Sequence, residues 1–421
     1  MARAAVAEDG VVGTGIALIV DGKLEYAGGI GSRTVGGAAV DGDTLFLVGS
    51  TTKMLTAATV MSLVDDGLLD VNAPLSTYLP KLSVERPFDV HDMTLSGLLS
   101  HTDGLEDTNA AQCSFSRFSE YGASDPVTLW GKPGTFFDYS NNDMALAAQV
   151  IESVVGTGSY EQAVRERIFT PAEMASATFD AVTAARSVNV ATGYYADPTG
   201  AFTKPVTVAQ TASECPILEP AGYAIASARD FGKFVEALLA GGGAMLQPDS
   251  VTRMETGILP TGYNPRDAET YGFGLFVDQI GGETVIDHSG DIPPFHSAVF
   301  FVPQARFGVV MLINADSSKT IGKVMEAAVT LFAPPPAALT PPAKTEPSAW
   351  RPYTGSYVDS YGALGAFSLT IQGTELSVNK PDGSSIGSLN QLDADHWVLA
   401  PSTPGAPSVD GVFSRDAAGT V

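Results

Sequence analysis

The segment that most constrains this chain is an apolar run at residues 54–64, directly preceded by Ser50-Thr51-Thr52-Lys53. Apolar residues lie on nearly every side of the helix that this run predicts, and such a helix is buried in the centre of a protein. Residues three positions apart share one helix face. We therefore expect the Ser50 hydroxyl and the Lys53 amine side by side at the start of a central helix that ends near Gly67.

This pairing favours acyl-transfer chemistry on a serine. A serine hydroxyl becomes a nucleophile when a neighbouring base takes its proton. The unpaired N–H groups and the dipole at a helix N-terminus favour developing negative charge. The same spacing recurs at Ser377 and Lys380, but in an alternating, strand-like segment closed by a turn at 381–383, and we interpret that recurrence as chance.

Composition excludes several kinds of partner. The 421 residues are 44% hydrophobic and 17% charged, which is typical of an ordered globular protein. A formal net charge of −24 repels nucleic acid and anionic membranes. No stretch approaches the ~18 uncharged apolar residues that a membrane span needs. We expect a small-molecule or peptide substrate, no nucleic-acid partner and no membrane span, and the oligomeric state stays open.

Hydrophobic patterns predict strands at both ends of the first three quarters of the chain and helices between them. We expect one sheet built from both ends with an inserted helical region. The predicted strands lie at 16–20, 24–27, 274–278, 284–287, 297–302 and 307–313, and the clearest helices at 143–155, 160–169, 229–240 and 319–332.

A change of composition divides the chain. Residues 333–349 are rich in Pro and Ala and predict a stiff linker. From residue 350 to 421, short alternating segments and Gly/Pro/Asp turns predict a small all-β module. The division is therefore 1–332, 333–349 and 350–421.

Two further short motifs carry side chains suited to catalysis, although each has a plain structural interpretation. Tyr139-Ser140-Asn141 follows a Pro-Gly turn and precedes a predicted helix, so it is also a good N-cap segment. A phenol near an ammonium can relay protons, and an asparagine amide can bind a substrate amide. His288-Ser289-Gly290 ends a predicted strand, where a substrate backbone could align as an added strand and a histidine could hold a carboxylate.

Ser-x-x-Lys, Tyr-x-Asn and His-x-Gly occur in this order, and with them the chain resembles the serine β-lactamase and penicillin-binding-protein superfamily. The resemblance is closest to the branch that holds class C β-lactamases, DD-carboxypeptidases, D-aminopeptidases and related esterases. It covers roughly residues 11–332. Other segments similar to the family are residues 43–46, 98–105, 133–141, 221–230 and 271–274.

The resemblance implies an α/β fold of the α+β kind, in which an antiparallel sheet is flanked by helices and joined to an all-helical region (β-lactamase/transpeptidase-like). Residues 1–332 would be the serine hydrolase domain. The module at 350–421 resembles, weakly, the small β-barrel-like domains appended to some of these hydrolases.

The resemblance also implies roles for single residues. Ser50 would be the nucleophile, and Lys53 and Tyr139 would share the general-base and proton-relay work. Asn141, His288, Ser289 and Gly290 would bind substrate, and the backbone N–H groups of Ser50 and Asp291 would form the oxyanion hole. No cofactor and no metal are implied.

These assignments predict a serine hydrolase that forms an acyl-enzyme on Ser50. It would cleave amide or ester bonds of small peptides, with D-residues expected, or of small esters. One alternative is a β-lactamase or DD-carboxypeptidase. Another is a non-catalytic acyl-sensing or binding protein, which the intact Ser50, Lys53 and Tyr139 argue against.

Departures from the family pattern bear on the substrate. His288 stands where class C β-lactamases typically carry lysine, which looks more like some DD-peptidases, D-aminopeptidases and esterases. Asp291 follows the motif where relatives often have glycine. It would attract a substrate amine if its carboxylate faced the site, and the alternative that we favour is a solvated turn residue.

Three remaining expectations concern histidine, cysteine and location. We expect His101 to be structural. Cys113 and Cys215 allow one disulfide, but we favour two free thiols. The family resemblance leads us to expect export to the periplasm or the exterior, although no signal peptide is visible in this sequence and a cytoplasmic location stays open.

Overall fold

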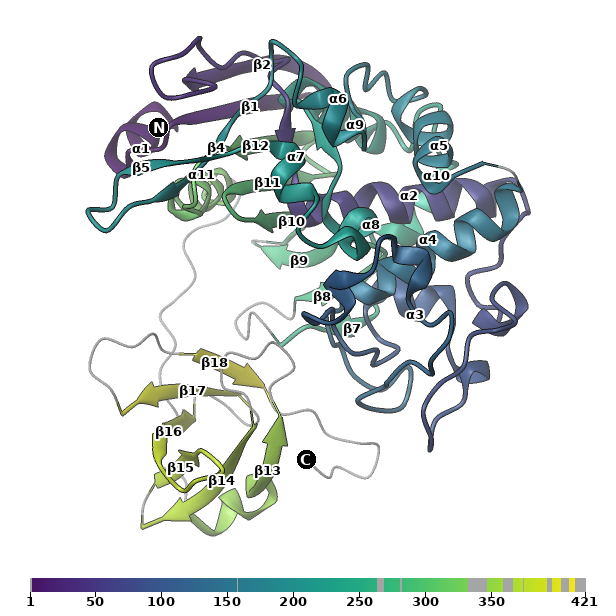
Figure 1. The fold of residues 1–421 in the computed structure, drawn as a ribbon, viewed down its shortest axis with the longest axis vertical. Helices are drawn as coiled ribbons and strands as arrows, with labels where there is room; N and C mark the ends of the chain where they lie inside the picture. Colours follow the sequence, from purple (N-terminus) through teal and green to yellow (C-terminus); the bar gives the residue numbers. More distant parts are fainter. Residues whose placement is uncertain are drawn as a thin grey trace.

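An eight-stranded antiparallel sheet forms the frame of the computed structural model (Figure 1). The structure describes residues 2–156, 158–262, 269–280, 282–331, 347–358, 366–373, 375–391, 396–402 and 409–412. The strand order is β2-β1-β12-β11-β10-β9-β8-β7. Their bounds are β1 Gly13–Val20, β2 Lys23–Gly31, β7 Leu259–Pro260, β8 Thr270–Tyr271, β9 Phe276–Ile280, β10 Glu283–Ile292, β11 Phe295–Val302 and β12 Phe307–Ile313.

The two ends of residues 1–332 meet in the middle of this sheet. Thr14 of β1 lies opposite Ile313 of β12, and the pairing continues to Ile19 opposite Gly308. The prediction of one sheet built from both ends, with an inserted helical region, is thus confirmed.

Helices cover both faces of the sheet. The α-helices are α1 Ala2–Asp9, α2 Thr52–Asp65, α3 Leu95–Ser100, α4 Asn141–Val155, α5 Tyr160–Val164, α6 Ala181–Ala184, α7 Val208–Ala212, α8 Glu219–Gly222, α9 Ala228–Leu239, α10 Pro248–Met254 and α11 Lys319–Val329. Ala17 packs toward α9, whereas its neighbour Ile16 packs toward α1 and α11. This division follows from the strand geometry, because successive side chains point to opposite faces of a sheet.

The predicted central helix is α2, and it is buried along nearly its whole length. All residues from Thr52 to Leu63 are buried. A single 3-10 turn, Gly49–Thr51, leads into α2 and carries Ser50. Gly49 adopts a φ of +58°, a conformation that glycine accepts without steric cost. Ser50 is therefore held at the start of a helix that the core fixes in place.

Some elements differ from the sequence predictions. Strand β10 continues to Ile292, through the whole His-x-Gly motif, because pairing with β11 persists beyond residue 287. The short pairs β3 (Phe46–Leu47) with β6 (Ile225–Ala226) and β4 (Gly193–Ala196) with β5 (Phe202–Val206) were not predicted. Strands of two to five residues, one with an internal proline, give no periodic signal.

The C-terminal part forms a second antiparallel sheet, with its strands in sequence order (Figure 1). The strands are β13 Gly355–Val358, β14 Ala366–Gln372, β15 Glu375–Asn379, β16 Ser385–Gln391, β17 His396–Pro401 and β18 Val409–Val412. Trp350, Leu376 and Trp397 belong to a core of their own. The all-β prediction is confirmed. The predicted linker lies outside the described residues as far as residue 346, and the exact domain boundaries stay predictions.

The expectation of two free thiols is wrong. Cys113 and Cys215 form a disulfide, with their Cα atoms 4.2 Å apart. The two cysteines are 102 residues apart in the sequence, and only the packing of the turn at Gln112–Ser114 against that at Pro216–Leu218 brings them together. Sequence spacing carries no trace of that contact.

Candidate active site

The amine of Lys53 lies at the centre of the predicted site. Its Nζ is 3.2 Å from Ser50 Oγ, 2.7 Å from Asn141 Oδ1 and 3.1 Å from the carbonyl oxygen of Ala221. The side chain of Lys53 is fully buried, while Ser50 is partly exposed. The nucleophile predicted from the sequence is thus open to solvent, and its predicted base is not.

Burial changes the protonation of this amine. Removal from water lowers the pKa of Lys53 to about 7, and the carboxylate of Asp107 acts in the opposite direction. A lysine with this pKa is about half neutral near pH 7. A neutral amine has a lone pair and can accept a proton, which is what a general base requires.

Tyr139 lies against the same amine. The Nζ of Lys53 is 4.7 Å from the centroid of the Tyr139 ring, and the ring also packs on His101 with 4.4 Å between centroids. The Tyr139 segment also starts a helix, because the Ser140 side chain accepts a hydrogen bond from the backbone N–H of Asn142 at the N-cap of α4. The N-cap interpretation of this motif is confirmed, and the catalytic role of Tyr139 stays a prediction.

Asp107 is a site residue that the sequence analysis missed. Its Oδ1 accepts hydrogen bonds from the backbone N–H of Asn141 at 2.7 Å and from Asn141 Nδ2 at 3.1 Å. Asp107 lies two residues beyond the family-like segment 98–105, and no spacing pattern pointed to it.

His288 is buried and makes two hydrogen bonds within the protein. Its Nδ1 is 2.6 Å from the carbonyl oxygen of Ser289, so Nδ1 carries the hydrogen. Its Nε2 then accepts from the hydroxyl of Tyr271 at 2.8 Å. Burial, and then the charge of Lys53, lower the pKa of His288 to about 3. At neutral pH the imidazole is therefore uncharged.

The two backbone N–H groups predicted for the oxyanion hole belong to segments in close contact. A Cβ added to Gly290 would lie 3.1 Å from the nitrogen of Ser50 and only 2.0 Å from the carbonyl oxygen of Val48. A Cβ added to Gly49 would lie 2.7 Å from the nitrogen of Asp291. Glycine at both positions allows β10 to approach the 3-10 turn Gly49–Thr51 this closely.

Strand β10 offers an edge beside Ser50. Residues 283–287 pair with β9, but within the described part of the chain residues 288–292 pair only with β11. The second edge of this segment, which contains Ser289 and Gly290, therefore has no paired strand among the described residues.

The side chain of Asp291 faces away from this site. Because side chains alternate along a strand, residue 291 points to the face opposite the one on which Gly290 meets Ser50. Its carboxylate lies 3.2 Å from Nδ1 of His296, whose Nε2 is 3.3 Å from Asp316. The idea that this carboxylate attracts a substrate amine gains no support from this geometry.

His101 lies behind the site rather than in it. It is the left-handed C-cap of α3, and its Nδ1 is 2.5 Å from Asp143 Oδ2. Burial lowers the pKa of His101 and raises that of Asp143, so the pair shares a proton without net charge. This position agrees with a structural role.

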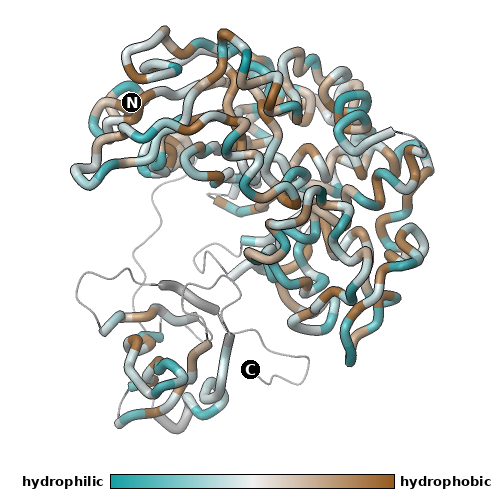
Figure 2. The backbone as a smooth tube through the Cα atoms, in the orientation of Figure 1, coloured by the Kyte–Doolittle hydropathy of each residue, from teal (hydrophilic) through white to brown (hydrophobic). Residues whose placement is uncertain are grey.

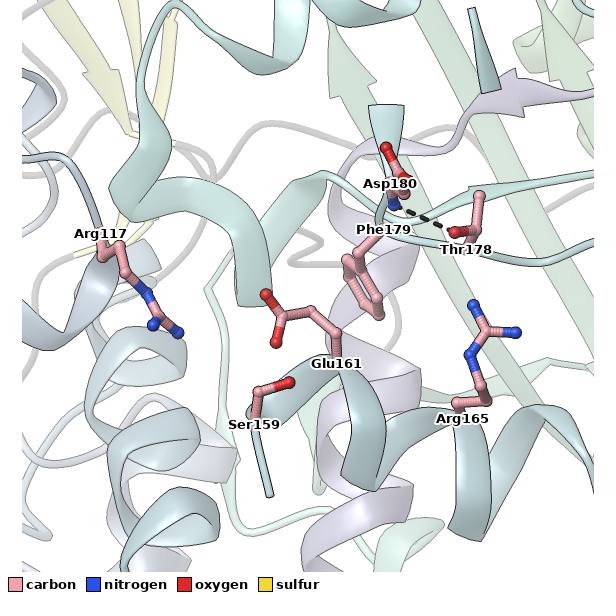
Figure 3. Close-up of a pocket in the computed structure, with 7 residues that line it drawn as sticks. All are labelled: Arg117, Ser159, Glu161, Arg165, Thr178, Phe179 and Asp180. Atoms are coloured by element: carbon pink, nitrogen blue, oxygen red, sulfur yellow. Dashed lines mark hydrogen bonds between the residues drawn. The ribbon is translucent and has the colours of Figure 1, made fainter. Parts of the chain in front are cut away.

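A separate cavity of about 300 Å³ lies elsewhere in the helical region (Figure 3). None of the predicted catalytic or substrate-binding residues is among those that line it. They are Arg117, Ser159, Glu161, Arg165, Thr178, Phe179 and Asp180. Among the described residues there is no metal-binding cluster of His, Cys, Asp and Glu, and no helix has the length and apolar character to cross a membrane.

Comparison with known proteins identifies the family of this chain. The family model described as Beta-lactamase matches residues 1–333. Penicillin-binding protein 4 of Amycolatopsis lactamdurans is 34% identical over 170 residues, which cover 39% of this chain and 44% of that protein. The chain spans 44%, 58% and 65% of the lengths of the first three curated relatives that it matches.

Solved structures share the fold. A D-stereospecific amidohydrolase from Streptomyces sp. is 27% identical with a TM-score of 0.60, and the match covers 76% of this chain and 95% of that one. An octameric penicillin-binding protein homologue from Pyrococcus abyssi is 22% identical with a TM-score of 0.68, covering 98% and 94%. The fold is therefore β-lactamase/transpeptidase-like, and the chain belongs to the Beta-lactamase family.

Proposed function

We propose that this protein is an amidase that forms an acyl-enzyme on Ser50 and hydrolyses amide bonds of small substrates containing D-residues. The observation that carries the proposal is the contact between a fully buried Lys53 amine and the Ser50 hydroxyl, 3.2 Å apart. A buried lysine next to a partly exposed serine costs stability, and a catalytic role explains why the chain keeps it.

In the proposed reaction, Lys53 takes the Ser50 proton as the serine oxygen attacks the substrate carbonyl. The N–H groups of Ser50 and Asp291 donate to the resulting oxyanion, and each such donor contributes about 3–4 kcal/mol in the transition state. Collapse breaks the C–N bond, and the leaving amine receives a proton through Lys53 and Tyr139. Water then attacks the ester of Ser50 by the same route in reverse, releasing the acid and restoring the hydroxyl.

The state of His288 supports an amide rather than a peptide with a free carboxylate. An imidazole that is neutral at pH 7, and whose Nε2 lone pair already accepts from Tyr271, gives a terminal carboxylate no cation to bind. The likeness to a D-stereospecific amidohydrolase, at 27% identity, supports the same substrate class.

The test is a substrate panel with wild-type protein and Ser50→Ala. It contains D- and L-aminoacyl p-nitroanilides, D-amino acid amides, p-nitrophenyl esters, nitrocefin and a peptide ending in D-Ala-D-Ala. We expect turnover of D-aminoacyl amides and a trapped acyl adduct on Ser50 by mass spectrometry. Faster turnover of nitrocefin, or release of D-Ala, would favour the β-lactamase or carboxypeptidase alternative. An adduct on another residue, or activity in Ser50→Ala, would refute the mechanism, and binding without any adduct would favour the non-catalytic alternative.

We also propose that the protein works in an oxidising compartment outside the cytoplasm. The disulfide between Cys113 and Cys215 supports this location, because such bonds persist mainly in oxidising environments. Fractionation of the natural host, followed by thiol titration of the denatured protein, tests it. A cytoplasmic protein with two free thiols would contradict it.

A further inference from the structure

The carboxylate of Asp107 accepts hydrogen bonds from Asn141 on the side away from Lys53. One carboxylate oxygen, Oδ1, accepts from both the backbone N–H and the side-chain Nδ2 of Asn141 at 2.7 and 3.1 Å, and Oδ2 lies 3.4 Å from Nδ2. The backbone N–H of Thr108 also donates to Oδ1, at 2.7 Å. The carboxylate therefore meets donors from two segments of the chain, and its position is fixed by both.

These contacts determine which end of the Asn141 amide faces the lysine. A carboxylate only accepts hydrogen bonds, so it selects the NH₂ end of the amide. The carbonyl end, Oδ1, must then point the other way, and it lies 2.7 Å from Lys53 Nζ. If the Asn141 amide were flipped, its NH₂ group would face the hydrogens of Lys53 Nζ. Its carbonyl oxygen would then face the carboxylate of Asp107, and both contacts would be repulsive.

The orientation of this amide decides where the Lys53 lone pair points. A neutral amine has two hydrogens and one lone pair. Asn141 Oδ1 and the Ala221 carbonyl oxygen lie within hydrogen-bonding distance of the amine and can only accept, so they take both hydrogens. The remaining direction, toward Ser50 Oγ at 3.2 Å, is left for the lone pair. In this arrangement the hydroxyl of Ser50 donates to the amine, which is the first step of its activation.

We propose that Asp107 is a positioning residue for the hydrolytic reaction: it fixes the Asn141 amide so that the lone pair of Lys53 faces the Ser50 hydroxyl. The negative charge of Asp107 also favours the protonated form of that amine. The role in catalysis rests on the proposed function, whereas the effect on Lys53 does not. Asp107 itself touches neither the serine nor the expected position of the substrate carbonyl, and it acts through Asn141.

Several other groups influence the charge of Lys53. Asp143 of α4 shares a proton with His101 and the pair carries no net charge, so the carboxylate of Asp107 is the main negative group acting on this amine. The neutral His288 approaches from β10. Asp107 differs from Asp143 because it hydrogen-bonds directly to the residue that accepts from Lys53. Its removal therefore changes both the charge near the amine and the direction of the amide.

Two substitutions separate these effects. Asp107→Asn removes the charge but keeps an oxygen that can accept from Asn141, and one oxygen suffices because Oδ1 alone takes both bonds at 3.1 Å or less. Asp107→Ala removes charge and acceptor together. Asp125→Asn is the matched control, because it removes the same formal charge from an exposed position in the same loop region.

The first readout does not depend on activity. Lysine residues carrying ¹³C at Cε are titrated by NMR in the full-length protein, with Lys53→Met used to assign the Lys53 signal. We expect a midpoint near pH 7 in the wild type, about 0.5–1.5 pH units lower in Asp107→Asn, and unchanged in Asp125→Asn. The sign follows from charge, since loss of a nearby carboxylate makes the ammonium form less favourable.

The second readout is the rate of Ser50 acylation by a p-nitrophenyl ester, measured by intact mass across pH 5–9. The acylation rate should rise with pH and then reach a plateau. In Asp107→Asn the rise should move to lower pH by the same amount as the Lys53 midpoint, and the plateau rate should stay within about threefold of the wild type. In Asp107→Ala the plateau itself should fall by about tenfold or more, because the amide is free to turn.

The outcomes distinguish this inference from the proposed function. A wild type that never acylates on Ser50 refutes the proposed function and the catalytic role, while the NMR midpoint still decides whether Asp107 controls Lys53. An unchanged Lys53 midpoint in Asp107→Asn overturns the inference. So does an Asp107→Ala plateau equal to that of Asp107→Asn. If Asp107→Ala fails to fold, the inference is decided by Asp107→Asn alone, from the midpoint of the Lys53 titration and the pH at which its acylation rate rises.

Discussion

Replacing Glu219 by glutamine should stabilise this protein at alkaline pH and leave its stability almost unchanged near pH 4.5. Glu219 begins α8, and the next two residues of that helix hold the site: the Pro220 carbonyl oxygen accepts from Thr56 and that of Ala221 accepts from Lys53. Burial, and then the neighbouring carboxylate of Glu161, raise the pKa of Glu219 from 4.5 to about 8, although Arg117 acts in the opposite direction.

The magnitude follows from the difference between the folded and unfolded states. Below pH 4.5 the Glu219 carboxyl is protonated in both the folded and the unfolded state, so folding buries no charge there. Between pH 4.5 and about 8 the unfolded chain loses the proton while the folded protein keeps it, and stability falls as pH rises. Above pH 8 the loss is complete, at about 4–5 kcal/mol. Glutamine has the shape of the protonated acid and avoids this loss.

The assay is urea denaturation of the full-length protein at pH 5, 7 and 9, comparing Glu219→Gln with the wild type. Glu25→Gln, at an exposed position of β2, removes the same formal charge without burial and serves as the control. We expect a difference of about 1 kcal/mol at pH 5 that grows to about 4–5 kcal/mol at pH 9. A difference that stays constant with pH, or that matches the control, would refute the reasoning.

Three further predictions test other parts of the structure. Because burial lowers the pKa of Lys53 to about 7, hydrolysis should require the neutral amine and kcat/KM should rise with pH through a midpoint near 7; a flat profile between pH 5.5 and 8.5 would contradict this. Reduction of the Cys113–Cys215 bond should lower the free energy of unfolding by about 2–4 kcal/mol, measured by denaturation with and without reductant, and equal curves would count against it. Gly290→Ala should lower the free energy of unfolding by about 1–3 kcal/mol and remove most of the activity, because the added Cβ would lie 2.0 Å from the carbonyl oxygen of Val48. Thermal melting and turnover assays test this. Wild-type values in both assays would show that strand β10 can move away from that oxygen.

Local patterns predicted much of the fold because they reflect local geometry. The spacing of Ser50 and Lys53 requires only the period of a helix, and α2 places their side chains 3.2 Å apart as that period predicts. The apolar run at residues 307–313 likewise predicted β12 with its bounds. Strand β10 was predicted too short, because Gly290 and Pro293 resemble a strand end, whereas its actual length depends on pairing with β11.

The candidate site was predictable only as a set of motifs. Ser50, Tyr139 and His288 could be named because each stands in a short pattern that the family shares. Asp107 and the carbonyl oxygen of Ala221 could not, because the first belongs to no pattern and every residue has the second. The free-thiol prediction for Cys113 failed for a related reason, since loop packing across 102 residues leaves no local signal.

By itself, the sequence determined that a serine and a lysine share one face at the start of a buried helix, that strands from both ends build one sheet, and that the chain is acidic and resembles a known family. The tertiary structure decided the protonation and direction of the groups at the site. In the folded protein Lys53 is buried and the Asn141 amide directs its oxygen toward Lys53. His288 is uncharged, and the side chain of Asp291 faces away from the site. Desolvation and hydrogen-bond direction depend on neighbours that are distant along the chain, and only the folded arrangement brings those neighbours together.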